Sequence, residues 1–62
     1  SSHGAGDVFV GALAAQRLAQ MPWESALRYA QAAAALHVAT PRRQRSAIIP
    51  SDIEALMQNS AL

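Results

Sequence analysis

The sequence predicts a mostly helical portion of an α/β protein, with a single short strand. Three stretches read as helices, and the short apolar run at 47–49 reads as a strand. A lone strand finds no ladder partner in these residues, and unpaired strand backbone is costly to bury. The first predicted helix is apolar on every side, so it needs more surrounding protein than these residues supply. We therefore expect residues 1–62 to be the C-terminal portion of a larger α/β protein.

The composition indicates a helical chain with a thin core and excludes several kinds of protein. Hydrophobic residues make up 52% of the chain but aromatic residues only 5%, and alanine adds little burial energy. Without cysteine, neither a disulfide framework nor a thiolate metal site can form. A net charge of +1 argues against nucleic acid as a partner, and no run approaches the roughly 20 apolar residues of a membrane span. With no cysteine and no secretory signal in view, we expect a cytoplasmic protein.

The first helix is expected to start at Gly6 or Asp7 and to run to about Gln20. Residues 8–15 are apolar or small on every side, as in a helix that is buried all round. Pro22 then ends this segment, because proline suits the first turn of a helix but not its interior.

A second helix is predicted from about Trp23 to Val38. The small residues at 32–35 permit the close approach of a neighbouring helix or of a ligand. We expect the two aromatic residues of this helix, Trp23 and Tyr29, to anchor it rather than to bind a ligand. Its polar stripe, at helical spacing, consists of Glu24, Arg28 and Gln31.

The rest of the chain is predicted to form a loop, the short strand and a third helix. The loop is "TPRRQRS", and the strand "AII" at 47–49 is bounded by Pro50. Ser51 is expected to cap the third helix, with Glu54 three residues later to complete a capping box. The predicted apolar face of this helix consists of Ile53, Leu56 and Met57.

The opening "GAGD" has the residue types of an anion site at the start of a helix. Gly4 and Gly6 allow backbone conformations and a close approach of ligand that other residues prevent. The first N–H groups of a helix lack intrahelical partners and suit a phosphate. Asp7 could then take the proton from a hydroxyl group that attacks phosphorus, while the N–H groups stabilise the transferred group. The alternative is structural, because an acidic residue in the first turn also complements the helix dipole.

The stretch "HGAGDVFVGALAA" resembles the C-terminal signature of the PfkB/ribokinase family of sugar and nucleoside kinases. The alanine-rich "YAQAAAALHVAT" and the closing "IIPSDIEALM" are similar to the helix and the strand–helix ending of that family, so the resemblance covers nearly all of the chain. It implies a three-layer α/β fold with a Rossmann-like central sheet, often with a small β lid. In such a kinase domain residues 1–62 would supply the anion-hole helix, a nucleotide-side helix, a short strand and the final helix.

The resemblance implies an ATP-dependent phosphotransferase that acts on a hydroxyl group of a sugar or related small molecule. Asp7 falls on the family's catalytic base, and Gly4, Ala5 and Gly6 fall on the anion hole for the transferred γ-phosphoryl group of the nucleotide. Gln31 falls where ribokinase-like members carry an asparagine near the nucleotide. Ribose, fructose, a keto-deoxy sugar acid, a nucleoside and a phosphorylated sugar all stay open as acceptors, because upstream residues choose among them.

Ser1 and Ser2 depart from the family pattern, which has Asp or Asn followed by Thr. In many members the first of these residues helps to bind an activating monovalent cation, and the loop "TPRRQRS" lacks the glycine of the family's cation loop. These departures put activation by a monovalent cation in doubt. Mg²⁺ is implied together with ATP, but the family's acidic motif for it lies upstream, so no residue here is assigned as a metal ligand.

Five further polar residues have a structural and a functional interpretation. His3 is expected to face solvent in a turn, with a phosphate or substrate contact as the alternative. His37 is expected to be packed or stabilised by the helix dipole, with a nucleotide contact as the alternative. The three arginines of the segment "TPRRQRS" are expected to lie in a solvated loop, where one of them could touch ATP. No aromatic residues alternate with them to stack on nucleic-acid bases. These three are Arg42, Arg43 and Arg45.

Two other functions stay open beside that of an ATP-dependent sugar-type kinase. One is a non-catalytic helical interaction or regulatory module, which needs a partner to bury its alanine-rich surface. The other is an inactive kinase-like protein, but the retention of Asp7 and of both glycines argues against it. A homodimer is also left open, because many members of the family dimerise through the lid.

Overall fold

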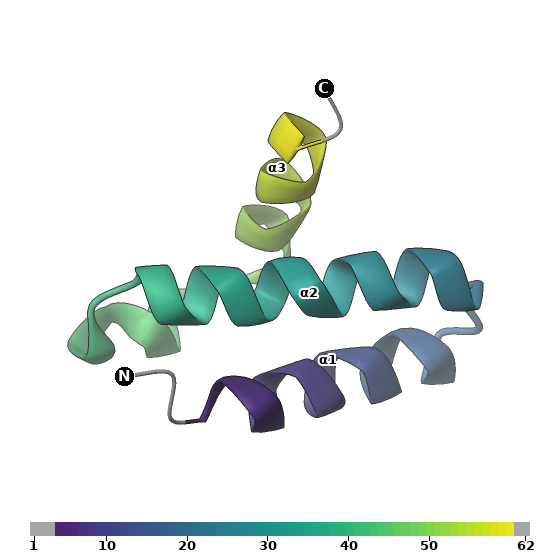
Figure 1. Cartoon of the computed structure of the whole chain (residues 1–62), viewed down its shortest axis with the longest axis horizontal. Helices are drawn as coiled ribbons and strands as arrows, with labels where there is room; N and C mark the ends of the chain where they lie inside the picture. Colours follow the sequence, from purple (N-terminus) through teal and green to yellow (C-terminus); the bar gives the residue numbers. More distant parts are fainter. Residues whose placement is uncertain (1–3, 61–62) are drawn as a thin grey trace.

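The computed structural model describes residues 4–60 and folds them into three α-helices and one 3-10 helix. Helix α1 spans Ala5–Leu18, helix α2 spans Trp23–Ala39, the 3-10 helix η1 spans Arg42–Ala47 and helix α3 spans Pro50–Ser60. Helices α1 and α2 form an antiparallel hairpin, and α3 packs steeply across α2 (Figure 1). The predicted first and second helices are confirmed, with small shifts at their ends. None of the helices within residues 4–60 is long and apolar enough to cross a membrane.

The turn between α1 and α2 stops the first helix with a left-handed cap. Gln20 has a φ of 63°, and its N–H donates to the Arg17 carbonyl at 2.9 Å. The Met21 N–H donates to the Gln16 carbonyl at 3.0 Å. Together these bonds make the Schellman arrangement, which satisfies carbonyl groups left over at a helix end. Pro22 then precedes α2, where a residue with a fixed φ and no N–H group is well tolerated.

A cation–π contact joins the two helices beside this turn. The Arg17 guanidinium lies over the Trp23 ring, with its central carbon 4.4 Å from the ring centroid. Such a contact contributes about 0.5–1 kcal/mol at an exposed site. The Trp23 side chain is 58% exposed, so it links the start of α2 to the end of α1 from the surface and does not anchor α2 in the core.

The core is small and lies where the three α-helices meet. Tyr29 and Ala33 of α2 and Ile53 of α3 form its buried cluster, and residues of α1 pack against the edge. Ala26 and Ala30 are fully buried on α2, and their short side chains allow α1 to approach closely. Tyr29 anchors α2 as predicted, and Ile53 confirms the inward face of the third helix. Because no large side chain within residues 4–60 is fully buried, alanine supplies much of the packing.

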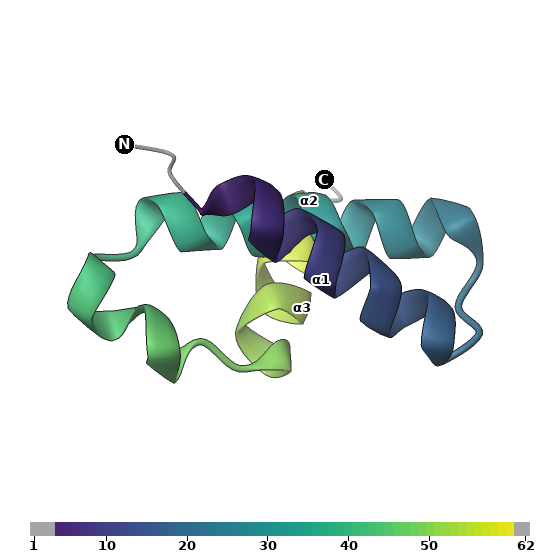
Figure 2. The same cartoon turned by 90° about the horizontal axis from the view of Figure 1, so that it is seen from below.

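Helix α1 is covered on one side only. None of its residues is buried, and the side chains of Val10 and Leu18 are 64% and 86% exposed. The view turned by 90° shows α1 running along the outside of α2 (Figure 2). The structure agrees with the expectation that these residues supply too little protein to surround the first helix, because α2 supplies most of the contacts of α1.

The predicted strand at 47–49 is wrong. The segment expected to be a loop folds as η1, which includes Ala47, and the backbone of Ile48 is then extended with φ −69° and ψ 126°. Residues 4–60 contain no strand, so this extended residue has no ladder partner among them. Instead, the Arg45 Nε donates to the Thr40 carbonyl at 3.0 Å and ties η1 to the end of α2. The described residues are thus helical, and the three-layer α/β fold stays a proposal.

Helix α3 begins before its predicted cap. Pro50 is its first residue, and the Ile49 N–H donates to Oδ2 of the Asp52 carboxylate at 3.0 Å. A carboxylate at the third helical position that reaches back to the residue before the helix is half of a capping box. The predicted box of Ser51 and Glu54 is therefore wrong, because proline fits the first helical position and moves the helix start toward the N-terminus.

Candidate active site

The first turn of α1 presents backbone N–H groups that the helix itself does not use. Gly4 precedes the helix with a φ of 91°, and the first helical hydrogen bond runs from the Val8 N–H to the Gly4 carbonyl at 3.0 Å. The N–H groups of Ala5, Gly6 and Asp7 come before that bond. Within the described part of the chain no side-chain hydrogen bond caps this end of α1. Free donors at the positive end of a helix dipole have the chemistry of an anion site.

Asp7 adds a carboxylate to the same turn. It lies in the first turn of α1 and its side chain is exposed. A negative side chain is favourable at this end of a helix because it complements the helix dipole. Exposure leaves room for a hydroxyl group to approach it. An exposed carboxylate and N–H groups that the helix itself does not use therefore share one helical turn.

The two glycines of the motif differ in what surrounds them. Gly4 has a left-handed φ, and a Cβ there would lie 3.5 Å from His37 Nε2. A side chain at this φ is strained, so the backbone itself requires glycine at this position. A Cβ at Gly6 would meet nothing within 4 Å. No contact within the described residues requires glycine at Gly6, which suits a position kept open for a ligand.

His37, near the end of α2, lies beside Gly4 at the start of α1. It lies in the last turn of α2 and is half-buried, so the prediction of a packed histidine is confirmed. That its ring faces Gly4 was not predicted, because the register of a helical hairpin depends on its turn. The available signal was the spacing of Ala26, Ala30, Ala33 and His37, which puts all four on one face of the helix.

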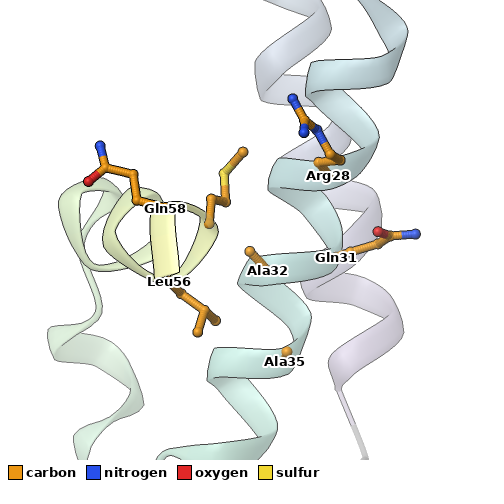
Figure 3. A pocket seen from close by; sticks show the side chains of 7 residues that line it. Arg28, Gln31, Ala32, Ala35, Leu56 and Gln58 are labelled. Atoms are coloured by element: carbon orange, nitrogen blue, oxygen red, sulfur yellow. The ribbon is translucent and has the colours of Figure 1, made fainter. Parts of the chain in front are cut away.

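Gln31 lies apart from the motif. It precedes His37 by six residues, about 9 Å along the helix axis, and it is off the face that carries His37. It borders a groove of about 530 Å³ between α2 and α3, and its side chain extends away from α3 (Figure 3). The structure therefore does not bring Gln31 together with Gly4–Asp7. The other residues that line this groove are Arg28, Ala32, Ala35, Leu56, Met57 and Gln58.

The three arginines of η1 have different surroundings. Arg42 and Arg43 are exposed, as predicted, although the segment is a 3-10 helix rather than a loop. Arg45 is half-buried, and its Nε donates to the Thr40 carbonyl. The Thr40 Oγ1 in turn donates to the Leu36 carbonyl at 2.6 Å. The expectation of a solvated side chain is therefore wrong for Arg45, which has a structural role.

The described residues do not form a metal centre. No group of three or more His, Asp or Glu side chains among residues 4–60 could hold a metal ion. Three of the acidic residues lie in the first turns of three separate helices: Asp7, Glu24 and Asp52. These residues therefore do not fit Mg²⁺, and no catalytic step below runs through a metal. His3, Ser1 and Ser2 lie outside the described residues.

Comparison with known protein families gives a match to most of the chain. The sequence model of the family described as pfkB family carbohydrate kinase matches residues 1–50, which include the whole of α1, α2 and η1. No curated protein matches the chain, and no solved structure matches it.

Proposed function

The chain belongs to the pfkB family of carbohydrate kinases, and on that basis we propose that it forms the C-terminal portion of a ribokinase-like kinase domain. Membership of this family indicates a kinase. The observation that carries the finer proposal is the start of α1, where the Asp7 carboxylate shares a turn with N–H groups that no hydrogen bond within residues 4–60 uses. Phosphoryl transfer needs both, because an attacking hydroxyl group loses a proton while negative charge must be stabilised on the transferred group.

In the proposed reaction Asp7 accepts the proton of the acceptor hydroxyl group. The hydroxyl oxygen forms a bond to the γ-phosphorus of ATP, and the bond from that phosphorus to the nucleoside diphosphate breaks. The N–H groups of Ala5, Gly6 and Asp7, a set one residue later than the Gly4, Ala5 and Gly6 that the family resemblance implies, donate to the oxygens of the transferred phosphoryl group. An ordinary carboxylate suffices as the base, because most of the catalysis in such reactions comes from positioning and electrostatics.

ATP is the proposed donor, and a sugar or nucleoside-like molecule is the proposed acceptor. Gly4 and Gly6 are proposed to contact the γ-phosphate, and Gln31 is proposed to contact the nucleotide at a distance from it. When bound with ATP, Mg²⁺ neutralises charge on the phosphates. Its ligands are proposed to lie outside residues 4–60, whose acidic side chains are dispersed.

The alternative of a non-catalytic interaction module draws on the exposed apolar surface of α1. Val10 and Leu18 are largely exposed, as on a surface that binds another protein. A domain that continues around α1 would cover the same side chains. The kinase proposal is preferred because it also accounts for Gly6, a glycine that no neighbour within the described residues requires.

The test is ADP release by the complete polypeptide that carries this sequence, with Mg-ATP and a panel of sugars, sugar acids and nucleosides. The proposal predicts turnover that depends on at least one acceptor, and the accepted molecules name the substrate class. ADP release that no acceptor stimulates, from a folded protein that binds ATP, would contradict it and favour the interaction module.

A further inference from the structure

We propose that His37 is a binding residue for the phosphoryl group at the start of α1, which rests on the function proposed above. The observation is the approach of α2 to this motif. The Nε2 atom of His37 is the side-chain atom that a Cβ at Gly4 would meet, at 3.5 Å. A ring nitrogen therefore lies beside the residue that precedes Ala5, Gly6 and Asp7, whose N–H groups are not used by any hydrogen bond within residues 4–60.

The packing around His37 points to a role beyond filling space. The residues that share its face of α2 are small and apolar, with Ala26 and Ala30 fully buried and Ala33 3% exposed. These alanines let α1 pack closely, and another alanine would continue the stripe. At the end of the stripe the helix carries a large polar ring instead, whose Nε2 would lie 3.5 Å from a Cβ at Gly4. His37 itself is only half-buried, so solvent or a ligand can reach it.

The electrostatics of both helix ends favour a donor at this position. His37 lies in the last turn of α2, where the partial negative charge of the carbonyl groups favours a donor or a cation. The start of α1 beside it favours an anion. The exposed carboxylate of Asp7 would repel that anion. An imidazole N–H directed at the anion offsets this repulsion, and imidazole can donate from Nε2 in either its neutral or its protonated form.

Two other polar side chains near the end of α2, those of Thr40 and Arg45, already donate hydrogen bonds to backbone carbonyl groups within residues 4–60. Thr40, one turn later, donates its hydroxyl to the Leu36 carbonyl, and Arg45 donates to the Thr40 carbonyl. These two polar side chains hold the end of α2 and η1 together. The His37 imidazole lies beside the motif, and its proposed partner is an oxygen of the transferred phosphoryl group.

The kinetic test compares His37→Ala and His37→Gln with Val38→Ala in the complete polypeptide. Val38 is the next residue along α2, its side chain is 47% exposed, and it serves as the matched control. Loss of a hydrogen bond to a charged group lowers kcat by about 10- to 100-fold in His37→Ala, with the KM for the acceptor nearly unchanged. His37→Gln keeps an N–H donor and is expected to recover part of kcat, which a purely structural role would not produce.

A second readout needs no variant. Inorganic phosphate, added to the unaltered complete polypeptide at constant ionic strength, is expected to shift the imidazole NMR signals of His37 saturably. If both His37 variants have the same kcat and KM as Val38→Ala while Asp7→Asn loses activity, the role of His37 is overturned and the kinase proposal stays intact. Absence of turnover in the unaltered protein would overturn the kinase proposal, and the phosphate titration would then decide the role of His37 alone.

Discussion

Gly4 and Gly6 lie two residues apart, but adding a methyl group has opposite consequences at the two positions. At Gly4 the φ of 91° is costly for an L residue, and the nearest side-chain atom is His37 Nε2. At Gly6 the backbone is helical and the space is open. The local structure thus explains the first glycine, whereas no contact within the described residues requires the second.

This difference gives a prediction for the stability of the 62-residue chain. Gly4→Ala is expected to lower the free energy of unfolding by about 1–2 kcal/mol, the cost of a left-handed non-glycine residue. Gly6→Ala is expected to raise it by up to about 1 kcal/mol, because alanine is the better helix former. Urea unfolding followed by circular dichroism measures both. Changes of the same sign would show that the start of α1 is not built as described.

At the scale of elements, the contact between α2 and α3 depends on a tyrosine that is sensitive to pH. Burial raises the pKa of the Tyr29 phenol above 10.0, and the negative charge of Glu54 on α3 raises it further. The folded state therefore favours the neutral phenol. The stability that this provides is complete below the unfolded-state pKa of 10.0, and it is lost as pH rises through the higher folded-state pKa.

We predict that the 62-residue chain loses stability as pH rises above 10.0 and that Tyr29→Phe removes most of this loss. The chain has one tyrosine and no lysine, so few other groups titrate in this range. Thermal melts at a series of pH values measure the effect. Glu54→Gln is the matched control for the charge and is expected to reduce the loss in part. An equally steep loss in Tyr29→Phe would place its cause elsewhere.

The helices show how far the sequence could predict the fold. The boundaries of α1 and α2 were predictable because Pro22 separates two long helical patterns. The strand was mispredicted because an extended residue such as Ile48 becomes a strand only with a partner, which a local pattern cannot supply. The cap of α3 was predicted at the wrong residue. Pro50 and the hydrogen bond from the Ile49 N–H to the Asp52 carboxylate fix the start of the helix, and Ser51 does not.

The candidate site was predictable only where it is local. Gly4 to Asp7 are consecutive, so their shared turn follows from a helix start alone. The approach of His37 joins residues more than thirty positions apart. It depends on the left-handed cap at Gln20 and on the close packing of α1 against the alanines of α2. Neither the turn geometry nor the helix register can be read from the pattern of apolar residues.

At the scale of the whole molecule, the exposed side of α1 distinguishes two possibilities. Further protein covers this side in the proposed kinase domain, whereas it stays exposed if residues 1–62 act alone. Val10 is 64% exposed in the structure of this chain. Replacing an exposed residue usually changes stability by less than about 0.5 kcal/mol. If further protein covers α1, the same replacement removes buried apolar surface worth about 1.5–3 kcal/mol.

We therefore predict that Val10→Ser leaves the unfolding of the 62-residue chain nearly unchanged and destabilises the complete polypeptide by about 1.5–3 kcal/mol. Denaturant unfolding of both molecules makes the comparison, with each unaltered molecule as its own control. An equal, small effect in both would mean that this face of α1 stays exposed. The proposal that residues 1–62 complete a larger kinase domain would then fail.

The measurement that tests the central claim most directly is turnover of the complete polypeptide after Asp7→Asn, compared with Glu24→Gln. Both residues are exposed acids in the first turn of a helix, so both complement a helix dipole. If Asp7 is the proton acceptor, its variant loses about 10²-fold or more in kcat, the scale of a lost general base, while Glu24→Gln retains activity. Equal activity in the two folded variants would mean that Asp7 serves only the helix and would remove it from the mechanism.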